Sequence, residues 1–156
     1  MEIGFIIVIV LILGAEFVNG WTDAPNAITT VVSTRTLTLK NSIVLATICN
    51  IAGVMTGTAV AKTIGTGFVD SEAVNLTTIA AAMSAIIMWS TITWIFGLPT
   101  SESHALVAAL TGAGLATAGF DSLLFIGWRN VLIGLFFSTF LGFTAAYLFT
   151  KVIRKS

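Results

Sequence analysis

The chain has 156 residues, of which 56% are hydrophobic and only 9% are charged. Soluble domains carry about 25% charged residues, so this composition excludes an ordinary soluble domain and predicts an all-α polytopic membrane protein in contact with membrane lipid. Seven basic and seven acidic residues balance, so the net charge of zero suggests no nucleic-acid partner. The single cysteine, Cys49, excludes a disulfide within the chain.

Five apolar segments are expected along the chain, at residues 3–18, 42–61, 74–96, 105–119 and 130–150. A membrane-spanning helix needs about 20 residues, so the second, third and fifth segments are long enough by themselves. The first and fourth are short, and each adjoins a motif of Gly, Pro and polar residues. No basic region precedes the first segment and no small-residue cleavage site follows it, so we expect a retained membrane helix rather than a signal peptide.

The first motif is "GWTDAPNA", residues 20–27. Gly20 and Pro25 predict a break in the first span, with Asp23 in a capping position and a new half-helix from about Asn26 onward. The free N–H groups of such a half-helix would line a polar cavity and could hold an anion. The alternative is that Asp23 and Asn26 only cap a kinked helix. The sequence leaves two roles open for Glu16: a carboxylate of the site, or an interfacial or helix-packing residue.

The second motif is "GLPTSESHA", residues 97–105. Gly97 and Pro99 are expected to end one helix and start another. The new first turn then carries four polar residues: Thr100, Ser101, Glu102 and Ser103. Hydroxyls and backbone N–H groups are donors for an oxyanion, although ordinary N-capping is the alternative. His104 could relay protons or could be structural. Nothing else suggests a transition-metal site.

Residues 73–119 could form two full passes or a re-entrant hairpin. Both interpretations predict an odd number of crossings, so a second copy of the unit fused in tandem would lie upside down, as in inverted-repeat secondary transporters. The chain contains no convincing internal repeat, and we therefore interpret residues 1–156 as a single transmembrane domain, one such repeat with broken or re-entrant helices.

The basic residues predict the orientation of the chain in the membrane. Two fall on one side: Lys62 and Arg129. Five fall on the other: Arg35, Lys40, Lys151, Arg154 and Lys155. The more basic side is expected to be cytoplasmic. The sequence therefore predicts a multi-pass protein of the cell (plasma or inner) membrane, with the N-terminus outside and the C-terminus inside.

The acidic residues of the two motifs lack basic partners within the apolar segments. If Asp23 and Glu102 share one cavity, an anion about 5 Å from either carboxylate is disfavoured by about 3 kcal/mol at an effective dielectric constant of 20. A bound cation or proton would offset this cost. An anionic substrate would therefore be carried by cation-coupled symport, whereas the same carboxylates could also serve a cation alone.

The segments "NGWTDAPNA" and "GLPTSESHALVAALTGAGLA" resemble the two signatures of the inorganic phosphate transporter (PiT) family, in the family's order and separation. The resemblance implies no enzyme and no cofactor, but a symporter that moves inorganic phosphate with sodium ions or protons. A symporter of this family is built from two inverted repeats that each carry both motifs. Alternating access between two halves would move the substrate.

The resemblance also implies roles for residues of both motifs. Asp23 and Asn26 would bind phosphate and the cation, a sodium ion in the first instance. Phosphate oxygens would be held by the Ser/Thr cluster: Thr100, Ser101 and Ser103. Two residues depart from the family pattern. Thr22 stands at the position of a cation ligand, and Glu102 stands at a position often filled by Ser or Thr. Glu102 could instead be protonated or bind the coupling cation.

The largest departure is length, because the chain resembles only the N-terminal half of a family member. One repeat supplies half of a site, so we expect a second transporter half, either an inverted copy of the chain or a separately encoded partner. The alternatives are a carrier for another oxyanion or for a cation, and a non-transporting membrane subunit or fragment.

Overall fold

The structure, a computed structural model, describes residues 2–57 and 67–154, and these residues are mostly helical. The elements in chain order are α1 (Glu2–Ser33), α2 (Leu39–Thr56), α4 (Leu76–Ile95), α5 (Glu102–Ala118), the short 3₁₀ helix η1 (Phe120–Ser122) and α6 (Phe125–Ile153). In this described part, α1, α2, α4 and α6 are long and apolar enough to cross a membrane. The predicted all-α polytopic membrane fold is confirmed.

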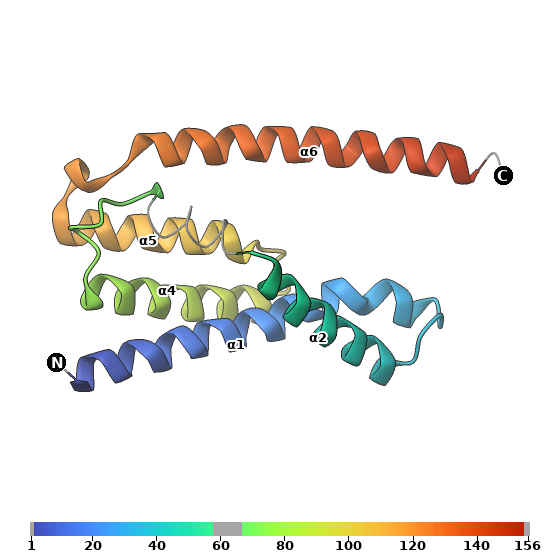
Figure 1. The fold of residues 1–156 in the computed structure, drawn as a ribbon, viewed down its shortest axis with the longest axis horizontal. Coiled ribbons are helices and arrows are strands. Elements are labelled where there is room, and N and C mark those ends of the chain that lie inside the picture. Colours follow the sequence, from blue (N-terminus) through green and yellow to red (C-terminus); the bar gives the residue numbers. More distant parts are fainter. Residues whose placement is uncertain (1, 58–66, 155–156) are drawn as a thin grey trace.

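Helices α1, α4 and α5 form the packed part of the molecule. Helix α4 lies between α1 and α5, and α2 crosses the second half of α1 (Figure 1). The buried core between α1 and α4 contains Ala15, Ala82, Met83 and Ile86. Small side chains such as these alanines let helix backbones approach closely, which is the main source of helix association in lipid.

Residues 67–70 fix the beginning of α6 to the end of the α4–α5 hairpin. The N–H of Leu124 donates to the carbonyl of Phe68 at 2.9 Å, and a single β-bridge joins Val69 to Leu123. Gly127 packs so closely that a Cβ atom at this position would lie 1.8 Å from the carbonyl oxygen of Gly67. Beyond this contact the side chains of α6 are largely exposed, and Figure 1 shows α6 running apart from the other helices.

The predicted break at the first motif is wrong. Helix α1 continues through Gly20 and Pro25 to Ser33, so no new half-helix begins near Asn26 and Asp23 is not an N-cap. A proline removes only its own N–H, in this case the donor to the carbonyl of Trp21. A full break would expose several backbone groups where no water is available to bind them, so the continuous helix is less costly in a membrane.

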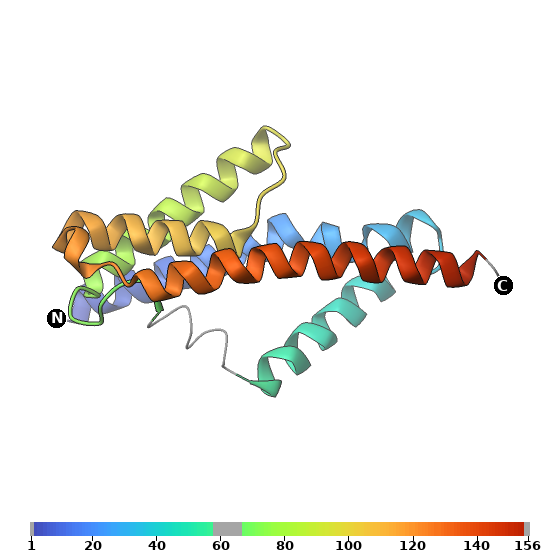
Figure 2. The same ribbon diagram turned by 90° about the horizontal axis from the view of Figure 1, so that it is seen from above.

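The predicted break at the second motif is confirmed. Helix α4 ends at Ile95, Gly97 adopts a positive φ of 64°, and α5 begins at Glu102. The resulting hairpin of α4 and α5 stops well short of the far ends of α1 and α6 (Figures 1 and 2).

The two ends of the molecule carry different chain segments. The N-terminus and the α5–α6 connection lie at one end, whereas the α1–α2 connection and the C-terminal end of α6 lie at the other (Figure 2). Arg35 therefore lies at the same end as Lys151 and Arg154, as the charge pattern predicts. Lys62 and Lys155 lie outside the described residues.

Candidate functional site

A polar cavity of about 470 Å³ lies between α1, the end of α4 and the segment that joins α4 to α5. Its polar side chains come from three places in the sequence: Thr22, Asp23 and Asn26 on α1, Ser90 and Thr93 on α4, and Thr100 before α5. Residues of the two sequence motifs therefore meet in one cavity. Trp21 and Trp94 stack edge to face with ring centroids 4.7 Å apart and hold α1 against the end of α4 beside it.

The α1 wall supplies a carboxylate and an amide one helical turn apart. Asn26 Nδ2 donates to Asp23 Oδ1 at 3.4 Å, and the Asp23 side chain is half-buried. The spacing of three residues places both side chains on one face of the continuous helix. An ionised carboxylate and an amide carbonyl offer further oxygen acceptors, and oxygen atoms are the ligands that hard cations prefer.

The α4 wall adds two hydroxyl groups that the sequence analysis missed. Ser90 and Thr93 are buried, and Thr93 Oγ1 lies 3.5 Å from Thr100 Oγ1. Thr93 also donates to the carbonyl of Trp89 at 2.9 Å, which fixes its rotamer. The sequence feature that could have identified them is a pair of hydroxyl residues three positions apart in an otherwise apolar segment, just before the second motif.

Glu102 lies behind the cavity and contacts two of its walls. Its carboxylate accepts a hydrogen bond from Ser90 Oγ at 2.8 Å and one from Thr22 Oγ1 at 3.2 Å. The latter bond joins the two motifs across 80 positions of sequence. Glu102 therefore adjoins the site, and its buried carboxylate is turned toward neighbouring side chains rather than into the cavity.

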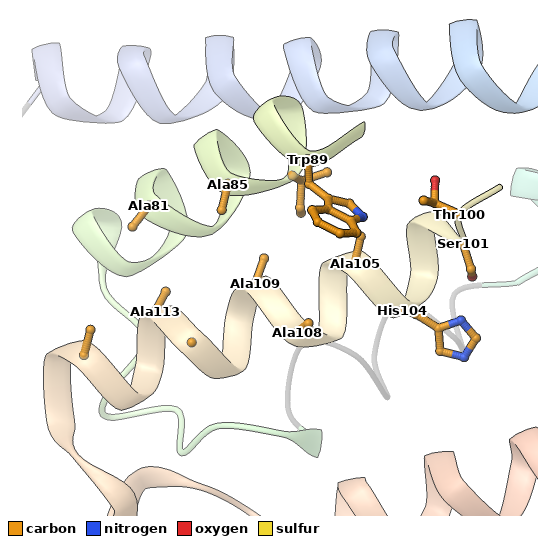
Figure 3. Close-up of a pocket in the computed structure, with 13 residues that line it drawn as sticks. Ala81, Ala85, Trp89, Thr100, Ser101, His104, Ala105, Ala108, Ala109 and Ala113 are labelled. Atoms are coloured by element: carbon orange, nitrogen blue, oxygen red, sulfur yellow. The ribbon is translucent and has the colours of Figure 1, made fainter. Parts of the chain in front are cut away.

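Three residues of the second motif do not face the polar cavity. Ser101 and His104 line a larger groove of about 830 Å³ between α4 and α5, whose floor is mostly alanine. Thr100 lines both hollows, and Figure 3 shows it pointing away from His104 at the beginning of α5. Ser103 is exposed and lies outside the linings of both hollows. The structure therefore brings Thr100 close to Asp23 but keeps Ser101 and Ser103 apart from it.

The site contains two acidic side chains. Asp23 and Glu102 lie on helices that contain no Lys or Arg. Within residues 2–57 and 67–154, no group of three or more His, Cys, Asp or Glu side chains gathers as a transition-metal site would require. The fold and site together define an integral membrane protein with a polar, acidic cavity at the tip of a helical hairpin.

The chain belongs to the Phosphate transporter family, whose profile matches residues 19–156. It is 37% identical over 96% of its length to a probable low-affinity inorganic phosphate transporter of Bacillus subtilis (strain 168). It is 40% identical over 88% of its length to one of Rhizobium meliloti (strain 1021) and 41% identical over 76% to one of Streptomyces halstedii. The matches cover 45%, 42% and 57% of these three relatives. No solved structure matches the chain.

Proposed function

We propose that the chain forms one half of a membrane transporter that moves inorganic phosphate together with sodium ions or protons by alternating access. The observation that carries the proposal is the polar cavity in which Asp23 and Asn26 of α1 meet Thr100 of the second motif. The names of the relatives support phosphate as the substrate. Such transport makes and breaks no covalent bond, so no enzymatic step is needed.

Within the cavity we assign the cation to the α1 wall. Asp23 and Asn26, with the hydroxyl of Thr22, would bind a sodium ion through oxygen atoms. The hydroxyl of Thr100 would donate to a phosphate oxygen from the opposite wall, and Thr93, whose own hydrogen is directed to the carbonyl of Trp89, would position it. Ser101 and Ser103 would contribute to the phosphate site only from the other side of the hairpin, where a second half could complete it.

The coupling to a cation follows from the charges. A phosphate oxygen about 5 Å from the Asp23 carboxylate is disfavoured by about 3 kcal/mol at an effective dielectric constant of 20. A sodium ion between the two groups, or a proton on either carboxylate, would offset this repulsion.

A second half is part of the proposal. The chain spans less than half of the Bacillus subtilis and Rhizobium meliloti relatives, and inverted-repeat transporters place their substrate between two halves. The partner would be a separate chain carrying the second pair of motifs or an inverted copy of this chain. The basic residues favour a single orientation in the cell membrane with the N-terminus outside, and they favour the separate chain.

Uptake of radiolabelled phosphate into proteoliposomes tests the proposal. The chain would be reconstituted alone and with the half of the Bacillus subtilis relative that lies outside the match, with sodium and pH varied. Phosphate uptake that depends on sodium or on a pH gradient supports the assignment. Stronger competition by sulfate than by arsenate would indicate a different oxyanion carrier, and sodium uptake without phosphate would indicate a cation carrier. No effect of the chain in either preparation would indicate a non-transporting subunit or fragment.

A further inference from the structure

Glu102 is the most enclosed acidic side chain among the residues that the structure describes. It is 9% exposed, and each of its carboxylate oxygens accepts a hydrogen bond from a different helix. Oε2 accepts from Ser90 of α4 at 2.8 Å, and Oε1 accepts from Thr22 of α1 at 3.2 Å. Glu102 itself lies in the first turn of α5, so a single side chain joins three helices.

The two partners of Glu102 lie next to the groups that line the cavity. Thr22 precedes Asp23, and Ser90 lies one helical turn before Thr93 on the same face of α4. A change in the separation of these partners would move the carboxylate of Asp23 relative to the hydroxyl of Thr93. The bonds to Glu102 therefore connect the two walls of the cavity through the first turn of α5.

We propose that Glu102 is a positioning residue that ties Thr22 and Ser90 to the first turn of α5 and so sets the width of the cavity. Its effect on transport rests on the proposed function, whereas the tie itself does not. The role differs from that of a ligand for the coupling cation. A cation ligand acts through its negative charge, whereas the tie acts through two hydrogen bonds.

Glutamine separates these two roles because it has the shape of glutamate without the charge. In Glu102→Gln the amide oxygen can accept from Ser90, and the amide N–H can donate to Thr22 Oγ1. The hydroxyl of Thr22, which no longer donates to residue 102, can then turn to the carbonyl of Val18, 3.0 Å away. Both bridges can therefore persist in the glutamine variant, whereas Glu102→Ala removes both.

The first test measures the geometry without transport. Spin labels at Ala27→Cys on α1 and Phe96→Cys after α4, both exposed positions, report the distance across the cavity in a Cys49→Ser background. We expect Glu102→Ala to shift or broaden the distance distribution and Glu102→Gln to leave it unchanged. An unchanged distribution in Glu102→Ala would overturn the proposal. If that variant does not insert into membranes, Ser90→Ala, which removes one of the two bonds, serves in its place.

The second test measures phosphate dependence in the preparation that takes up phosphate. We expect Glu102→Ala to raise the half-saturating phosphate concentration about tenfold, as for the loss of a hydrogen bond to a charged group, and Glu102→Gln to change it less than about twofold. Ser90→Ala should act in the same direction and add little in the Glu102→Ala background. Equal losses in the glutamine and alanine variants, with a matching change in sodium dependence, would assign Glu102 to the cation and refute the tie. Absence of uptake by the unsubstituted chain would refute the proposed function alone, because the spin-label distances still report on the tie.

Discussion

Replacing Asp23 by asparagine removes the negative charge of the α1 wall with almost no change in shape. A sodium ion about 4 Å from the carboxylate gains about 4 kcal/mol at an effective dielectric constant of 20 and about 1 kcal/mol in bulk water. Because the side chain is half-buried, the true environment lies between these limits. The half-saturating sodium concentration of Asp23→Asn should therefore rise between about fivefold and about 1,000-fold, and uptake at a fixed sodium concentration should fall accordingly.

The assay is phosphate uptake at a series of sodium concentrations, in the preparation in which the unsubstituted chain is active. Resistance to carbonate extraction shows that the variant still inserts into the membrane. Glu16→Gln is the matched control, because Glu16 is an exposed carboxylate on the same helix, outside the lining of the cavity. Unchanged uptake in Asp23→Asn would refute the assignment, as would an equal loss in both variants.

Three further changes test the cavity and the fold. Thr93→Val removes a hydroxyl from the cavity at constant shape, and the half-saturating phosphate concentration in the uptake assay should rise about fivefold; no change would exclude this hydroxyl from the site. Pro25→Ala restores a helical N–H donor, so thermal unfolding in detergent should occur at a higher temperature; a lower one would contradict a continuous α1. Gly127→Ala places a methyl group against the backbone of Gly67 and should destabilise the protein by about 1–3 kcal/mol in a denaturant titration. Gly134→Ala, on the same helix with open space around it, should be neutral, and equal effects of the two alanines would refute the close contact.

The sequence predicts the helices and the second break because their signals are local. Long apolar segments indicate membrane helices, and Gly97 and Pro99 followed by hydroxyl residues indicate a helix end and a new beginning. The same kinds of residue predict the first break. Pro25, however, removes only one backbone hydrogen bond of the helix, whereas a broken helix would lose several. The sequence of residues 20–27 does not show this difference in cost between a continuous and a broken helix, because the difference depends on the absence of water around the backbone.

The polar cavity was only partly predictable, for a related reason. Asp23, Asn26 and Thr100 carry polar groups in conspicuous motifs, and the structure places them together. Ser90 and Thr93 are single hydroxyl residues in an apolar helix, where such side chains commonly bond to the preceding turn. Their part in the cavity follows from the packing of α4 between α1 and α5. The bond between Thr22 and Glu102 likewise depends on tertiary packing that no local spacing specifies.

The close approach at Gly127 leaves α6 fastened at one end and bare along most of its 29 residues. Within this chain, its own backbone bonds rather than neighbouring side chains then maintain most of this helix. Extraction into detergent would accordingly loosen α6 before the α1–α4–α5 unit, and amide hydrogens in its second half would exchange sooner than those of α4. In detergent the cavity would thus stay intact even when α6 has moved away from the other helices.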